Sequence, residues 1–156
     1  MELVLKSASE ETTLALGSSL GSAASPGDVI CLIGELGTGK TVIVRGMARA
    51  RGHSGPVTSP TFTIINEYVD AGLCHVDAYR LDTGEQLIGA GIDDYLDGEW
   101  VCAVEWADRV RPALPSNALS IEIAFGEAEN ERVITIREEG GWDGRLARIM
   151  KELMSE

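Results

Sequence analysis

The stretch that decides the fold is Gly34-Glu35-Leu36-Gly37-Thr38-Gly39-Lys40-Thr41, which fills the pattern G-x-x-x-x-G-K-[ST] without a mismatch. Glycines let the backbone turn tightly and expose its N–H groups, which can then donate to phosphate oxygens. The Lys40 ammonium can reach the outer phosphates as a point charge, and the Thr41 hydroxyl can ligate Mg²⁺. The stretch therefore predicts a loop that binds the phosphates of a nucleotide.

The segments on either side of this loop have the patterns that the motif requires. Before it, Asp28–Ile33 is a nearly continuous apolar run, typical of a strand buried on both faces of a parallel sheet. After it, Thr41–Arg51 spaces Ile43 and Met47 for one face of a helix that ends at Gly52. Because strand, loop and helix follow in the required order, an ordinary glycine-rich turn is a poor alternative. The N-terminal end of the helix adds a positive dipole toward the phosphates.

A second apolar run, Trp100–Glu105, ends in a carboxylate. This is the form of a Walker-B strand, which brings an acid beside the phosphates to hold Mg²⁺ directly or through water. A strand-end glutamate facing solvent is the alternative, because many apolar runs are followed by an acid. Together with the phosphate loop, Glu105 becomes the leading second ligand for the metal. Trp106, the next residue, is interpreted as a packing aromatic.

The remaining segments indicate an α/β fold. Ser7 or Ser9 can cap a first helix that runs to Gly21, and a Thr83–Gln86 capping-box spacing starts another. Strand patterns occur at Glu2–Lys6, Thr61–Val69, Leu73–Tyr79, Leu119–Phe125 and Arg132–Arg137, and an amphipathic helix pattern at Trp142–Met154. We predict one domain over residues 1–156, a three-layer P-loop NTPase-like fold with a mostly parallel central sheet plus antiparallel strands.

Composition limits the classes of function. The net charge is −12 and only three of the 156 residues are lysines, so direct and tight binding of nucleic acid is not expected. No apolar run is long enough to cross a bilayer, and the N-terminal residues do not have the pattern of a signal peptide. The three cysteines have no metal-ligand spacing and are interpreted as small buried hydrophobes. These features predict a cytoplasmic protein that needs neither DNA nor a membrane as a partner.

The segment His53–Pro60 is a polar loop with several glycines and prolines, between the loop helix and the next strand. In many phosphate-loop proteins a nucleotide-sensing segment lies at this point of the chain. An ordinary connection is an equally good interpretation of this pattern.

Four segments, in order along the chain, together resemble the bacterial TsaE (YjeE) family. Besides the phosphate loop they are Thr58-Ser59-Pro60-Thr61-Phe62, His75-Val76-Asp77-Ala78-Tyr79-Arg80-Leu81 and Val104-Glu105-Trp106. The phosphate loop is shared with very many ATPases, but the other three are much more specific as a set. The family comprises small ATPases needed to make threonylcarbamoyladenosine in tRNA, and the resemblance runs from about Ser9 to Trp106.

The resemblance implies a role for each matching residue. ATP would be held by Glu35, Leu36, Gly37, Thr38, Gly39, Lys40, Thr41 and Val42, with Ser9 and Arg132 bordering the adenosine. Mg²⁺ would be bound by Thr41 and Glu105, and Asp77 would lie at the metal and attacking-water side. The switch region would be Ser59, Pro60, Thr61 and Phe62, with Trp106 beside the active site. The family more often has Asp at position 35, Ala at 38 and Thr at 42, but none of these departures touches Lys40 or Thr41.

The resemblance also implies partners and a reaction. TsaE-like proteins dock on the TsaD–TsaB pair, to which the tRNA and the threonylcarbamoyl chemistry belong, so tRNA is an indirect partner. The expected reaction is hydrolysis of the ATP γ-phosphate, with Lys40, Asp77 and Glu105 as the catalytic set. Whether Asp77 orients water, activates it or shares the metal stays open. We expect slow hydrolysis by the chain alone, because no stimulating arginine is evident.

Two other classes share the phosphate loop. A small-molecule or nucleoside kinase would need an acceptor pocket and usually an arginine-rich lid, whereas Arg80, Arg109 and Arg111 are scattered. A GTPase switch usually carries an Asn/Thr-Lys-x-Asp segment, and the only lysine after the loop, Lys151, precedes Glu-Leu-Met. The kinase remains the alternative to the ATPase.

Overall fold

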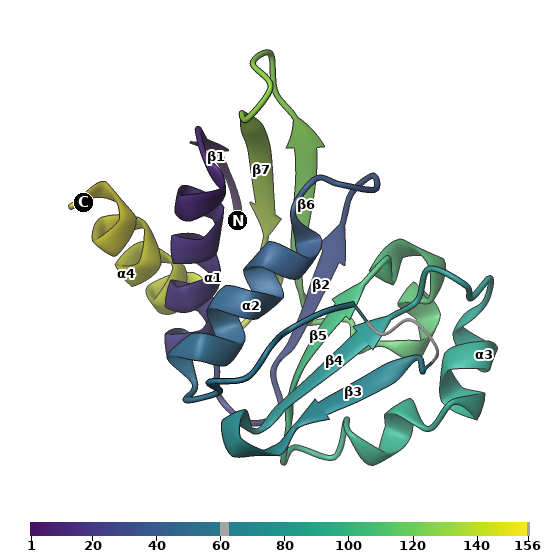
Figure 1. The fold of residues 1–156 in the computed structure, drawn as a ribbon. Coiled ribbons are helices and arrows are strands. Elements are labelled where there is room, and N and C mark those ends of the chain that lie inside the picture. The colour runs from purple at the N-terminus through teal and green to yellow at the C-terminus, as the bar shows by residue number, and fades with distance from the viewer. Residues whose placement is uncertain (60–62, 156) are drawn as a thin grey trace.

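The computed structural model describes residues 1–59 and 63–155, and these form a seven-stranded sheet in the order β1-β7-β6-β2-β5-β4-β3 (Figure 1). The strands are β1 Glu2–Ser7, β2 Val29–Ile33, β3 Ile65–Tyr68, β4 Leu73–Asp77, β5 Val101–Glu105, β6 Leu119–Phe125 and β7 Arg132–Arg137. The central strands β6, β2, β5 and β4 are parallel, whereas β7 and β1 at one edge and β3 at the other pair antiparallel. The predicted mixed sheet with a parallel centre is confirmed.

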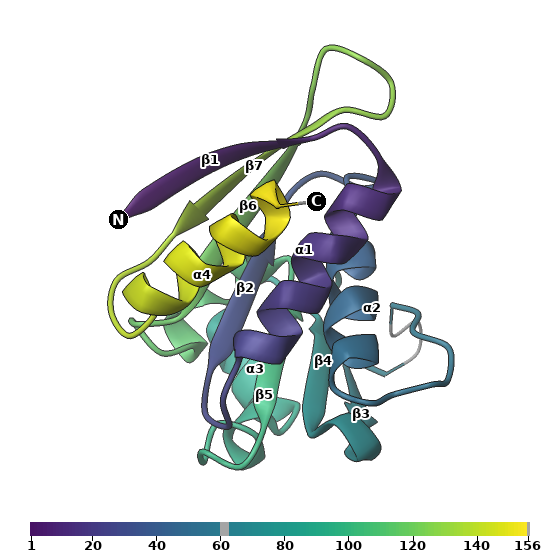
Figure 2. The ribbon, with the colours of Figure 1, turned by 90° about the vertical axis from the view of Figure 1, so that its left-hand side faces the viewer.

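Helices cover both faces of the sheet and complete three layers. Helices α1 Glu10–Ala23, α2 Lys40–Ala50 and α4 Asp143–Met154 lie together over one face (Figure 2). Helix α3 Gly84–Gly89 and several short 3₁₀ turns pack on the other face. Within the described part of the chain, no helix is long and apolar enough to cross a membrane.

The alternation of side chains along β2 divides the core into two clusters. Ile30 and Leu32 pack under α1 and α2, whereas Val29 and Cys31 pack on the α3 side. Because both faces of the strand are covered, its near-continuous apolar run is the pattern that a buried parallel strand requires. The three cysteines are buried, as predicted, and they form no disulfides.

The starts of the helices resolve one alternative that the sequence left open. Ser9 is the N-cap of α1, because its hydroxyl accepts from the Thr12 N–H at 3.2 Å. Ser7 instead donates to the Ser9 carbonyl at 2.8 Å and lies 2.7 Å from the Thr13 hydroxyl. The helix also continues two residues past Gly21, where the sequence predicted its end.

The predicted strand Thr61–Val69 is too long. Of its described residues, only Ile65–Tyr68 pair with β4, and a 3₁₀ turn begins at Val69. The partner strand ends at Asp77 rather than at Tyr79: the Ala78 N–H still donates to the Glu105 carbonyl of β5, but the Tyr79 N–H donates to the Asp77 carboxylate at 2.9 Å instead of to a strand. At the other end of this pairing, the Ile64 carbonyl accepts from the Asp77 N–H at 2.9 Å, so β3 begins opposite the end of β4.

The packing of α1 on α2 depends on glycines at the contact. A methyl group added at Gly46 in α2 would lie 2.3 Å from the Leu14 carbonyl oxygen, and one added at Gly17 in α1 would lie 2.3 Å from the Ile43 carbonyl oxygen. Real Cβ atoms do not approach backbone oxygens so closely. This contact holds α2, and therefore the phosphate loop before it, at a fixed distance from α1.

Replacement of Gly46 by Ala should lower the free energy of unfolding by about 1–3 kcal/mol, because the helices must separate to admit the methyl group. Gly144→Ala in α4 is the matched control, since its methyl group would meet no atom within 4 Å. Chemical denaturation of both variants measures the effect. A Gly46→Ala protein as stable as the control would contradict the close contact between the helices.

Candidate functional site

The phosphate loop connects the end of β2 to the start of α2, as its sequence predicts. Gly39 is the N-cap of α2 with φ 116°, and Gly37 has φ 83°. These left-handed conformations strain any residue with a Cβ, which explains why glycine stands at both positions. Helix α2 begins at Lys40, so its free N–H groups lie at the loop, in the arrangement that binds anions.

Lys40 is buried against its own loop. Its ammonium donates to the carbonyls of Gly34 at 2.5 Å and Glu35 at 2.9 Å, and lies 4.1 Å from the centre of the Trp106 ring. Burial lowers the pKa of this ammonium, while the negative charge of Glu105 opposes the change. An ammonium has three donors, so two carbonyl bonds leave one for a phosphate.

Glu105 lies at the end of β5, directly below the start of α2. Its carboxylate is only 3% exposed. The Thr41 hydroxyl lies 3.1 Å from both of its oxygens, and the Ser59 hydroxyl lies 3.3 Å from Oε2 and 2.7 Å from the Thr41 hydroxyl. Three side chains that the sequence singled out from distant segments therefore meet at one point.

Asp77 is the neighbour of Glu105 in the sheet, because the two residues are paired in register at the ends of β4 and β5. Its carboxylate is partly exposed and accepts from the Tyr79 N–H at 2.9 Å. Partial burial raises the pKa of Asp77 above its ordinary value, although the Tyr79 N–H opposes this. Asp77 is thus an acid of altered strength beside the Glu105 carboxylate.

Trp106 has φ 59°, the only positive φ of a non-glycine residue in the ranges 1–59 and 63–155. The left-handed turn brings its indole back under the phosphate loop, 5.1 Å from the Tyr79 ring. The Arg109 guanidinium lies 5.0 Å from the centre of the Trp106 ring, while it also donates to the Tyr79 carbonyl at 2.5 Å. Trp106 therefore lies in the site between cationic groups, and it also packs against the core on the α3 side of the sheet.

A cleft of about 350 Å³ joins these groups. Its lining includes Leu36, Gly37, Gly39, Lys40, Thr41, Val42, Ser59, Asp77, Tyr79, Glu105 and Trp106. Of the described residues in this lining, Lys40 is the only cation. Of the predicted switch region, Ser59 is in the cleft, while Pro60, Thr61 and Phe62 lie outside the described residues.

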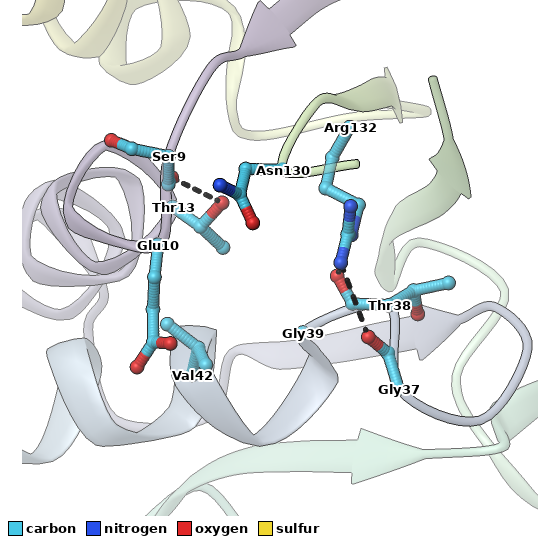
Figure 3. Close-up of a pocket in the computed structure, with 9 residues that line it drawn as sticks. All are labelled: Ser9, Glu10, Thr13, Gly37, Thr38, Gly39, Val42, Asn130 and Arg132. Atoms are coloured by element: carbon cyan, nitrogen blue, oxygen red, sulfur yellow. Dashed lines mark hydrogen bonds between the residues drawn. The ribbon is translucent and has the colours of Figure 1, made fainter. Parts of the chain in front are cut away.

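A smaller pocket of about 110 Å³ adjoins the other side of the loop (Figure 3). It brings Ser9 and Arg132 together, although they are 123 positions apart in the sequence. The Arg132 guanidinium donates to the carbonyls of Thr38 at 3.0 Å and Gly37 at 3.5 Å, so it ties the β6–β7 hairpin to the loop. Of the residues that the resemblance assigned to ATP, Glu35 is not in the lining of either pocket and is exposed.

Sequence reasoning missed several residues of these pockets. Glu10, Thr13 and Asn130 line the smaller pocket (Figure 3), and no motif marks them. His75 is fully buried, with Nε2 2.5 Å from Glu105 Oε2. The signal that could have found it is its place two residues before Asp77, because alternate residues of a strand point to the same face.

The oxygen ligands at this point fit a small hard cation. Thr41 offers a hydroxyl and Glu105 a carboxylate, and Mg²⁺ in nucleotide sites is bound by one or two such groups, phosphates and water. The described residues contain no group of three or more His, Cys, Asp or Glu that could hold a metal alone. Thr41 and Glu105 offer oxygen donors of the kind that Mg²⁺ accepts beside phosphates.

Comparisons with known proteins agree on one family. Residues 7–134 match the family described as Threonylcarbamoyl adenosine biosynthesis protein TsaE. The chain is 42% identical over 137 residues to the tRNA threonylcarbamoyladenosine biosynthesis protein TsaE of Bacillus subtilis, an alignment that covers 86% of this chain and 84% of that protein. It is 36% identical over 126 residues to the protein of the same name from a Nostoc species, with 77% and 76% covered.

The fold comparison leads to the same result. The crystal structure of Bacillus subtilis YdiB has a TM-score of 0.76 to this chain at 35% sequence identity, with 99% of this chain and 95% of that chain covered. The match extends over the whole three-layer architecture. The chain therefore belongs to the TsaE family.

Proposed function

We propose that residues 1–156 act as a single Mg²⁺-dependent P-loop ATPase domain, which hydrolyses the γ-phosphate of ATP in support of the TsaD–TsaB pair. The TsaE family takes part in tRNA threonylcarbamoyladenosine biosynthesis. The observation that carries the ATPase assignment is the meeting of Thr41 with the buried Glu105 carboxylate beside Lys40. A hydroxyl and an acid at this spacing, below a phosphate-binding loop, are the metal-binding half of an ATPase site.

In this mechanism the phosphate loop binds the phosphates of ATP, and a side chain of the cleft orients the attacking water. The N–H groups at the start of α2 and the Lys40 ammonium hold the phosphates and stabilise the charge that develops during transfer. Bound through Thr41 and Glu105, Mg²⁺ would supply neutralisation of charge on the phosphate oxygens. Asp77 accepts a hydrogen bond from, and thereby orients, the attacking water at the open side of the cleft.

The smaller pocket is assigned to the adenosine. It adjoins the loop at Gly37–Gly39, next to the first helix turn, which begins at Ser9. Asn130 carries an amide that can both donate to and accept from a base. Arg132 joins the β6–β7 hairpin, which carries Asn130, to the phosphate loop. Ser9, Asn130 and Arg132 are proposed to border the base and ribose.

The small number of cations in the cleft is the reason to expect that hydrolysis depends on a partner. An arginine that reaches the transferred phosphate contributes roughly 10³- to 10⁵-fold to related reactions. In the described lining of the cleft Lys40 is the only cation, and Arg109 is engaged with Tyr79 and Trp106. We therefore expect slow turnover by the chain alone, and stimulation by the partner complex. The net charge of −12 disfavours direct binding of tRNA by this chain, which supports the proposal that TsaD and TsaB bind the tRNA.

Lys40→Ala should reduce ATP affinity and hydrolysis by about 10²-fold or more, because the charge that binds the outer phosphates is lost. Lys6→Ala is the matched control, since Lys6 is exposed on β1 away from both pockets. Calorimetric titration with ATP and a phosphate-release assay measure both variants, and circular dichroism checks the fold. Equal activity of the Lys40→Ala and Lys6→Ala proteins would refute the site.

Asp77→Asn should reduce hydrolysis by about 10²-fold or more while raising the thermal stability of the metal-free protein. The pKa of Asp77 is raised in the folded state, so the ionised carboxylate destabilises the fold at every pH above that folded pKa. The stability difference between Asn and Asp should therefore be largest near neutral pH. It should disappear as the pH falls through the folded pKa and below the ordinary value of 3.8. Thermal unfolding of both proteins in EDTA, from neutral pH to below 3.8, measures this difference. An Asp77→Asn protein less stable than the unaltered protein at pH 7 would contradict the prediction.

The cognate TsaD–TsaB pair should stimulate ATP hydrolysis by a factor of about 10 or more, through a stimulating group that the chain alone does not bring to the cleft. The measurement is phosphate release with and without the pair, using Lys40→Ala as the blank. If the protein binds ATP but the pair does not stimulate hydrolysis, the proposed coupling of hydrolysis to TsaD–TsaB is wrong. Transfer of phosphate to a small hydroxyl compound would then favour the kinase.

A further inference from the structure

We propose that His75 is a positioning residue, which holds the Glu105 carboxylate in the orientation that binds the metal–nucleotide complex. The inference rests on the proposed function, because it concerns the same carboxylate. It adds a residue that neither the loop motif nor the Walker-B pattern contains. His75 does not line the cleft, so it acts through Glu105 and not on the nucleotide itself.

Strand register brings the two side chains together. Leu73, His75 and Asp77 alternate along β4 and point to the α2 side of the sheet, where Leu73 joins the core under that helix. His75 is paired with Ala103 of β5, and Asp77 is paired with Glu105. Because Ala103 is small, the imidazole can reach diagonally past it to the carboxylate two residues further along β5.

The contact fixes which atom donates. A carboxylate oxygen can only accept, so the His75 Nε2 that lies 2.5 Å from Glu105 Oε2 must carry the hydrogen. The same Oε2 is 3.3 Å from the Ser59 hydroxyl, and the Thr41 hydroxyl is 3.1 Å from both oxygens. Donors therefore reach the carboxylate from two sides, and rotation about its side-chain bonds would break at least one of these contacts.

The imidazole is itself held from the opposite side. The Tyr68 hydroxyl lies 3.4 Å from His75 Nδ1, and the two rings stack with their centres 6.1 Å apart. Burial raises the pKa of the Tyr68 hydroxyl, so it keeps its hydrogen and can donate to Nδ1. A ring with a partner on each nitrogen has one orientation, which is the arrangement that supports metal ligands in other proteins.

A purely structural role for His75 predicts a different behaviour. If the imidazole only fills space and satisfies a buried acid, its replacement would change stability but not the metal affinity of the folded protein. If it positions Glu105, the metal affinity depends on a donor at the place of Nε2. Glutamine can place an amide nitrogen there, whereas asparagine carries the same amide on a side chain one carbon shorter and cannot reach Glu105.

The experiment measures Mn²⁺, as a probe for Mg²⁺, bound to the protein–ADP complex by the loss of the free-ion electron paramagnetic resonance signal. His75→Asn should weaken Mn²⁺ binding by roughly 10- to 100-fold, the usual effect of removing the partner of a metal ligand. His75→Gln should restore most of the affinity. Equal Mn²⁺ affinities of the Asn, Gln and unaltered proteins would overturn the proposal.

A double-mutant cycle tests whether His75 acts through Glu105. In a Glu105→Gln background, His75→Asn should have no further effect on Mn²⁺ affinity, and an equal loss in both backgrounds would overturn the proposal. If the His75 variants do not fold, Tyr68→Phe leaves the imidazole in place and should weaken Mn²⁺ binding by about two- to tenfold. An unchanged affinity in that variant would equally count against the proposal.

Lys40→Ala separates this inference from the proposed function. Loss of ADP and Mn²⁺ binding in Lys40→Ala, with no effect of the His75 variants, would leave the ATPase site intact and remove only the role of His75. Retention of both ligands by Lys40→Ala would refute the site itself.

Discussion

The contact between the Thr41 hydroxyl and the Glu105 carboxylate is the constraint on which the site depends. It joins the first turn of α2 to the end of β5, and it exists only because β2 and β5 are neighbours with Leu32 in register with Glu105. A slip of one residue would turn the carboxylate to the other face of the sheet. The register is held by strands buried on both faces, so the packing of the core determines the geometry of the proposed metal site.

The close packing of α1 on α2 also fixes the position of the phosphate loop, because the loop leads directly into α2. Helix α2 cannot move away from the sheet without leaving α1, against which Gly46 allows backbone contact. Arg132 adds a third support, because its guanidinium holds the loop carbonyls from the β6–β7 hairpin. The loop backbone is therefore held by a helix, a sheet and a hairpin before any ligand binds, which reduces the ordering that binding requires.

The sequence predicts most of the fold and the centre of the site, and the exceptions have physical causes. The bounds of β6 and β7 follow from alternation, and the phosphate loop from chemistry that only a few residue types provide. The start of β3 does not follow from propensity, because it depends on where the antiparallel partner strand β4 stops. His75 lies in a segment that carries the family resemblance, but its contact with Glu105 depends on strand register, as the place of Asn130 in the smaller pocket depends on hairpin geometry.

The two carboxylates at the ends of β4 and β5 are in different surroundings, and this difference supports a division of roles. Glu105 is buried among Thr41, Ser59 and His75, an environment that holds its carboxylate in one orientation. Asp77 is partly exposed, accepts from one backbone N–H, and has a raised pKa. Adjacent acids in unlike environments can take different roles in one active site. This difference supports the proposal that Glu105 binds the metal and that Asp77 orients the attacking water.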